Sequence, residues 1–186
     1  MKSRSLYAIE KLNNLPTFKN QRPISTREKM TNSATPYTRV IQDNFLTIMN
    51  FAFSHRVLED LLKTKFEGEW KILNRVLFTD GEQRASQAFI VLAVYLRKLD
   101  DIQGLSKWDN KSYGTLTLHN ERTDALTLRE VANKIIHSAS REWSFTQKDK
   151  PIFRCESHET DRQKNTWWSA DIDVVALAGF CGHLCY

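Results

Sequence analysis

The sequence predicts an α+β protein with a core of four helices, then a small antiparallel sheet, and a flexible arm at the N-terminus. Apolar residues recur at helical spacing over 37–141. After residue 142 they alternate with polar residues over short segments, as in half-buried strands. Residues 1–36 contain three prolines and few apolar residues after Leu15. We therefore expect an arm over 1–36 and a single α+β domain over 37–186, which is helical over 37–141 and β-rich over 142–186.

Size and composition are those of an ordinary globular chain. The 186 residues are 41% apolar and 11% aromatic, enough for one core. No apolar run is long enough for a membrane span, and no apolar stretch of a secretory signal follows the first basic residues. Three cysteines, all after residue 150, do not form a disulfide framework. These observations predict a cytoplasmic protein.

The net charge of +5 is concentrated in the arm. Residues 1–36 hold two acidic and seven basic side chains, and the remaining 150 residues are neutral overall with 20 of each sign. Such an arm suits phosphates, an anionic membrane surface or an acidic protein, although a merely solubilising tail has the same composition. The candidate polyanion-binding residues are Lys2, Arg4, Lys11, Lys19, Arg22, Arg27 and Lys29.

Three helices are expected before residue 104. Residues 37–64 form a long helix that Thr35 and Pro36 would begin, and its broad apolar face favours a central position. A shorter helix follows over Trp70–Phe78, with Trp70, Leu73, Val76 and Leu77 facing inward. Thr79 and Glu82 have capping-box spacing and would open a third helix over Glu82–Asp100. We expect Trp108 and Tyr113 to anchor the polar loop after Gly104.

Two polar pairs on these helices have ordinary interpretations. His55 and Glu59 are four residues apart, which suits a metal, but a surface pair is the simpler interpretation. Asp100 and Asp101 are neighbours, so on a helix they point about 100° apart, and we interpret them as a solvated helix end rather than an acid–base pair.

The best-defined helix in the sequence is 126–141. Thr127 and Glu130 have the spacing of a capping box, and six residues form one apolar face behind it: Leu128, Val131, Ala132, Ile135, Ile136 and Ala139. Arg129, Asn133 and His137 lie at successive intervals of four on a flank that points away from this face. That flank is either a site, with His137 as an acid–base group and Arg129 as a phosphate ligand, or a solvated face on which Glu130 pairs with Lys134.

The residues Arg129, Asn133 and His137 within a late helix of a bundle resemble the motif helix of the HEPN superfamily. This resemblance implies a dimeric, metal-independent ribonuclease of a defence or toxin system, with His137 as the acid–base residue and Arg129 holding the scissile phosphate. Seven residues separate Arg129 from His137, against four to six in the family pattern, and Glu130 follows the arginine. The resemblance covers about ten residues of the chain.

The segment after residue 142 has strand-like patterns over 142–145, 152–155 and 167–177, a hairpin turn over 148–151 and an exposed loop over 156–165. A last turn of helix is expected before residue 186. Five side chains here could in principle bind zinc, but their spacing lacks a Cys-x-x-Cys knuckle and buried thiols are the simpler interpretation: Cys155, His158, Cys181, His183 and Cys185. Four aromatic residues could stack bases or fill the core, namely Trp143, Phe145, Trp167 and Trp168.

No glycine-rich phosphate loop, nucleophile elbow or His-Glu-x-x-His motif occurs. We therefore expect a small binding or regulatory protein that acts through protein or nucleic-acid contacts, without cofactor or metal. The alternative is the HEPN-like ribonuclease with Arg129, Asn133 and His137 as catalytic residues. Whether the protein is an enzyme, and whether it forms a homodimer, stays open at this stage.

Overall fold

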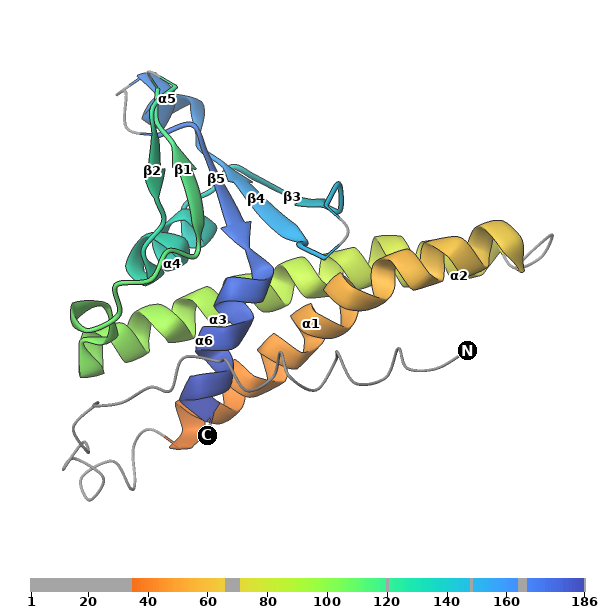
Figure 1. The fold of residues 1–186 in the computed structure, drawn as a ribbon, viewed down its shortest axis with the longest axis horizontal. Helices are drawn as coiled ribbons and strands as arrows, with labels where there is room; N and C mark the ends of the chain where they lie inside the picture. Colours follow the sequence, from red (N-terminus) through yellow and green to blue (C-terminus); the bar gives the residue numbers. More distant parts are fainter. Residues whose placement is uncertain (1–34, 66–70, 120, 148, 164–166, 186) are drawn as a thin grey trace, which may run out of the picture. The chain divides into compact units, whose positions relative to one another are not determined.

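The chain has an α+β fold, in which helices pack on one five-stranded antiparallel sheet (Figure 1). A computed structural model describes residues 35–65, 71–119, 121–147, 149–163 and 167–185. Residues 1–34 of the predicted arm therefore lie outside the described residues. Within the described part of the chain, none of the helices combines the length and the apolar character that crossing a membrane requires.

Two long helices form the framework. Helix α1 (Thr35–Thr64) confirms the expected long helix, and α3 (Gly81–Gln103) confirms the third one. They pack through buried side chains that include Ile41 and Ile48 of α1 and Phe89 and Leu92 of α3. Gly104 ends α3 in the left-handed conformation, with φ of 65°, as glycine readily does.

The sheet has the strand order β2-β1-β5-β4-β3, with every neighbouring pair antiparallel. The strands are β1 (Gly114–Thr117), β2 (Thr123–Ala125), β3 (Ser140–Ser144), β4 (Ile152–Glu156) and β5 (Ser169–Asp173). Phe153, Cys155, Ala170 and Ile172 alternate inward from the two central strands into the core. Gly114 is required where β1 meets β5, because a Cβ there would lie 2.0 Å from the Asp171 carbonyl oxygen.

Three shorter helices complete the fold: α4 (Leu128–Ile136), α5 (Glu159–Gln163) and α6 (Val174–Cys185). The expected capping box of α4 is confirmed. Thr127 N–H donates to the Glu130 carboxylate at 2.9 Å, and Glu130 N–H donates to the Thr127 hydroxyl. Asp173 caps α6 by accepting from two backbone N–H groups, those of Val175 and Ala176.

Several expected boundaries are wrong. The helix predicted over 126–141 ends at Ile136, because residues 140–144 pair with β4 as strand β3. Ala139 is accordingly exposed instead of being in the core. The strand predicted to reach residue 177 gives way to α6 at Val174, and the loop predicted over 156–165 contains α5. The sheet also begins before α4, with the β1–β2 hairpin.

The segment before α3 also differs from expectation. Helix α2 (Lys71–Asn74) continues through a π-helical stretch, η3 (Arg75–Asp80), directly into α3, so Thr79 lies inside the helical run and the predicted capping box does not form. Val76 is exposed rather than inward. In the loop after α3 and its 3₁₀ turn η4 (Leu105–Lys107), Tyr113 is buried as expected, but Trp108 is 61% exposed.

Candidate functional site

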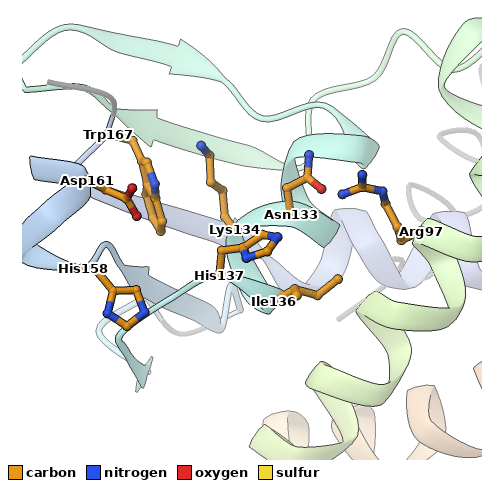
Figure 2. A pocket seen from close by; sticks show the side chains of 8 residues that line it. All are labelled: Arg97, Asn133, Lys134, Ile136, His137, His158, Asp161 and Trp167. Atoms are coloured by element: carbon orange, nitrogen blue, oxygen red, sulfur yellow. The ribbon is translucent and has the colours of Figure 1, made fainter. Parts of the chain in front are cut away.

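The polar flank of α4 borders an open concavity of about 560 Å³ (Figure 2). Helix α4 contributes one wall, α3 contributes Arg97 at one end, and His158, Asp161 and Trp167 lie at the other end. The lining side chains are Arg97, Asn133, Lys134, Ile136, His137, His158, Asp161 and Trp167. Among the described residues, one guanidinium, one lysine amine, two imidazoles and one amide therefore share this surface with a single carboxylate.

Local structure explains why α4 presents these groups outward. The buried side chains Leu128, Val131 and Ile135 fix its inner face, and the capping box fixes its start. Asn133 and His137 then fall on the opposite side, and His137 is exposed at the C-terminal end of the helix. The prediction that this flank lies off the core is confirmed.

The three residues of this flank nevertheless do not share one site, because Arg129 does not border this concavity. Its guanidinium donates to Asp100 at 2.6 Å and to Asp101 at 2.9 Å, next to a separate hollow at the end of α3. These carboxylates raise the pKa of Arg129, so its charge is permanent and already paired. Of the three residues predicted together, Asn133 and His137 share a site and Arg129 lies elsewhere.

Asp100 is not the solvated residue that the sequence suggested. Its side chain is only 2% exposed and accepts hydrogen bonds from the Ser106 backbone at 2.7 Å, the Ser106 hydroxyl at 3.1 Å and Arg129. Burial by itself would raise the pKa of this carboxyl, but these three donors outweigh it and hold the pKa below its usual value. Asp100 thus fixes the end of α3 to α4.

Lys134 lies over the ring of Trp167, with 4.6 Å between Nζ and the ring centroid. Its expected surface pairing with Glu130 is replaced by this contact, since the Glu130 carboxylate accepts from the Thr127 backbone and hydroxyl. Burial lowers the pKa of Lys134, and the charges of Glu130 and Asp161 oppose that shift. An anion entering the concavity would stabilise the protonated amine.

Asn133 provides the one unsatisfied group in this surface. Its Oδ1 is buried and has no hydrogen-bond partner among the described residues. A buried polar atom without a partner costs about 1–3 kcal/mol, and because this oxygen only accepts, its partner would have to be an N–H or O–H donor. Asn133 and Arg97 both line the concavity (Figure 2).

The five zinc-type side chains are not brought together. Cys155 and Cys181 lie in the core, where burial raises each thiol pKa to about 12. Cys185 contacts the Thr38 carbonyl, and His158 borders the concavity. Over the described ranges, no group of three or more histidine, cysteine, aspartate or glutamate side chains could hold a metal.

The His55–Glu59 pair is likewise separated. Glu59 binds Lys63 at 2.6 Å, whereas His55 stacks on Phe145 with 3.8 Å between ring centroids. Burial lowers the pKa of His55, and none of the described residues pairs with its Nδ1. His55 is therefore part of an aromatic cluster with Phe51 and Phe78.

The aromatic residues considered as base-stacking groups serve mainly as core. Trp143 packs against Phe89 and Phe153, and its indole N–H donates to Ser86 at 3.1 Å. Trp167 is 4% exposed and covered by Lys134. Trp168 is the exception, since it is 38% exposed beside His119.

Sequence reasoning missed Arg97, Lys134 and Asp161 as site residues. Each lies on a helix of ordinary appearance, and only the packing of α3 and α5 around α4 brings the three together.

Comparisons with protein families, characterised proteins and solved structures find no match to this chain.

Proposed function

We propose that this is a nucleic-acid-binding regulatory protein of the cytoplasm, and that the concavity beside α4 binds the phosphate backbone. The observation that supports it most is the gathering of Arg97, Lys134, His137 and His158 on one open surface with a single acidic residue, Asp161. Backbone phosphates are the ligands that such donors suit best. All three cysteines are free, which agrees with a reducing compartment.

The state of each cation supports binding at this surface rather than at Arg129. Two carboxylates already neutralise Arg129. Arg97 is only loosely paired, with 3.9 Å between its Nε and Asp101, and Lys134 contacts an aromatic ring. A phosphate therefore gains more from Arg97 and Lys134 than from Arg129.

The basic arm would add affinity without specificity. Its seven lysine and arginine side chains can follow a polyanion, while the concavity fixes where the chain of phosphates meets the folded domain. This division of roles makes separate predictions for the two regions.

The direct test is a double variant, Arg97→Gln with Lys134→Gln, titrated into a labelled single-stranded RNA while fluorescence anisotropy is recorded. We expect affinity to fall, and the slope of log K against log salt to fall by about 1 for each cation removed. The matched control is Arg39→Gln with Lys98→Gln, exposed cations of α1 and α3 that do not border the concavity. Equal losses in both double variants would refute the proposed site.

A second candidate function is metal-independent RNA cleavage at the same surface, as the HEPN resemblance suggests. The observation that favours it is that two imidazoles, His137 and His158, share the concavity with Arg97. His137 would take the proton of a ribose 2′-hydroxyl as that oxygen attacks the adjacent phosphorus. His158 would give a proton to the departing 5′-oxygen, which leaves a 2′,3′-cyclic phosphate. In this arrangement Arg97 takes the phosphate-binding role first assigned to Arg129.

His137→Ala separates the two candidates. If the protein is a metal-independent ribonuclease, wild type cleaves RNA in the presence of a chelator and the His137→Ala variant does not. The fold of the variant, followed by circular dichroism, is unchanged. A binding protein shows no cleavage in either form and binds RNA with at most a modest loss. Wild-type cleavage without metal that His137→Ala abolishes would overturn the non-catalytic proposal.

A further inference from the structure

Two of the five histidines of the chain line the concavity beside α4, namely His137 and His158. They come from two different elements, since His137 ends α4 and His158 directly precedes α5 (Figure 2). The other three lie elsewhere. His55 belongs to the aromatic cluster, His119 follows β1, and His183 is exposed on α6. The predicted basic arm contains no histidine.

An imidazole is the side chain that changes its charge near neutral pH, and a negative charge beside it favours the protonated form. A backbone phosphate carries such a charge. A nucleic-acid strand seated in the concavity would place phosphates beside His137 and His158. The protein would then hold more protons with the strand bound than without it.

The charged groups around the two imidazoles come from several elements. Arg97 of α3, Lys134 of α4 and Asp161 of α5 line the same concavity. Arg141 of β3 donates to a backbone carbonyl in the last turn of α4 at 2.9 Å, and Glu156 of β4 accepts from a serine hydroxyl at 3.1 Å. Because cations outnumber carboxylates among the described lining residues, most of the negative charge beside the imidazoles has to come from a ligand.

We propose that the concavity binds phosphates and protons together, with His137 and His158 as the proton acceptors, so that a polyanion is held more tightly as pH falls from 8 to 6. This inference rests on the proposed phosphate-binding function and adds the regulation of the same site. By linkage, affinity changes with pH in proportion to the number of protons taken up on binding. The protein would capture a polyanion when the pH falls and release it when the pH rises.

The test uses the full chain and a fluorescently labelled oligothymidylate, whose backbone has phosphates but no 2′-hydroxyl at which cleavage could start. Anisotropy titrations at pH 6 and pH 8 and one salt concentration give the affinities, and circular dichroism checks the fold at both values. Wild type is expected to bind roughly twenty-five-fold more tightly at pH 6, about fivefold for each histidine. Calorimetry at pH 7 in two buffers of different ionisation enthalpy should show net uptake of about one proton.

Histidine variants assign the protons. His137→Gln and His158→Gln should each remove about fivefold of the pH difference, and the double variant should remove all of it. The matched controls are His119→Gln and His183→Gln, two exposed histidines that do not border the concavity, and both should keep the full difference.

Lys134 is the other group of the concavity that could take up a proton, because burial lowers its pKa. Lys134→Gln is expected to bind more weakly at both pH values and to keep the ratio between them. A pH difference that disappears in Lys134→Gln would overturn the assignment to the imidazoles.

Two further outcomes separate this inference from the function on which it rests. Equal wild-type affinity at pH 6 and pH 8, or a difference that survives in the double histidine variant, overturns the proton linkage and leaves the phosphate site standing. Absence of binding at either pH overturns the proposed function itself, and the linkage with it.

Discussion

Helix α4 and the distal segment, by which we mean residues 53–64 of α1 together with residues 72–84, are both helical, yet they bury their apolar side chains to opposite degrees. In α4, Leu128, Val131 and Ile135 are at most 1% exposed, and the polar flank opposite them borders the concavity. The distal segment is longer, and every one of its residues is at least partly exposed. Helix formation alone therefore does not determine where a core forms; contacts from other elements do.

The contrast indicates two kinds of surface. A helix held firmly by its inner face can hold polar groups in fixed positions, which a ligand site requires. A hairpin with uncovered apolar residues gains stability only when something else packs on it.

Truncation of buried residues in α4 should give the largest loss of stability. We expect Ile135→Ala to lower the free energy of unfolding by about 2–5 kcal/mol, the range for buried large-to-small changes. Val57→Ala in the distal segment should change it by less than about 0.5 kcal/mol, since that side chain is 62% exposed. Urea denaturation at a protein concentration where the chain is monomeric measures both. Similar losses at the two positions would contradict the comparison.

Asp100→Ala should have the next largest effect, because it leaves Arg129 and the Ser106 N–H without their shared acceptor. We expect a loss of about 1.5–3 kcal/mol, as for hydrogen bonds to charged groups. Its folded pKa is lowered, so this stabilisation is present above the unfolded value of 3.8 and is lost as pH falls through the folded pKa. Asp101→Ala is the control, and a loss equal to that of Asp100→Ala would contradict the assignment.

The α+β class and three of the helices could be predicted from the sequence, because helical periodicity and capping are local properties. The capping box of Thr127 and Glu130 depends on residues three apart, and it forms as expected. The capping box expected at Thr79 does not form, because η3 continues unbroken into α3. Short strands such as β1 and β2 give little periodic signal, and their pairing with β5 is a tertiary property.

The candidate site was predictable only in part, for the same reason. The outward direction of Asn133 and His137 follows from the helix angle, but nothing local indicates that Arg97 approaches them. The pairing of Arg129 with Asp100 joins residues that are 29 apart in sequence. Contacts between distant segments thus decided which of the three expected residues share a site.

The His55 side chain predicts a moderate pH dependence of the distal segment. Burial holds its folded pKa below the unfolded value of 6.5, so the unfolded state binds the proton more tightly. Stability from this residue is complete above pH 6.5 and declines as pH falls from there to the folded pKa. His55→Phe keeps a ring against Phe145 and should remove this part of the dependence in urea titrations between pH 5 and pH 7.5. Identical pH profiles for both proteins would contradict it.

Removal of residues 1–34, which leaves α1 to begin at Thr35, should have the smallest effect on stability, within about 0.5 kcal/mol. Binding to polyanions should weaken and depend less on salt, because the seven basic side chains of the predicted arm are lost. Elution from a heparin column measures this. Elution at the same salt concentration as wild type would refute a binding role for the arm.

The most direct test of the central claim is a backbone and side-chain NMR titration of the full chain with single-stranded RNA. Binding at the concavity predicts shifts in Arg97, Asn133, His137 and His158, with the distal segment unchanged. Shifts confined to the distal segment, or to the surface around Trp168, would contradict the proposed site.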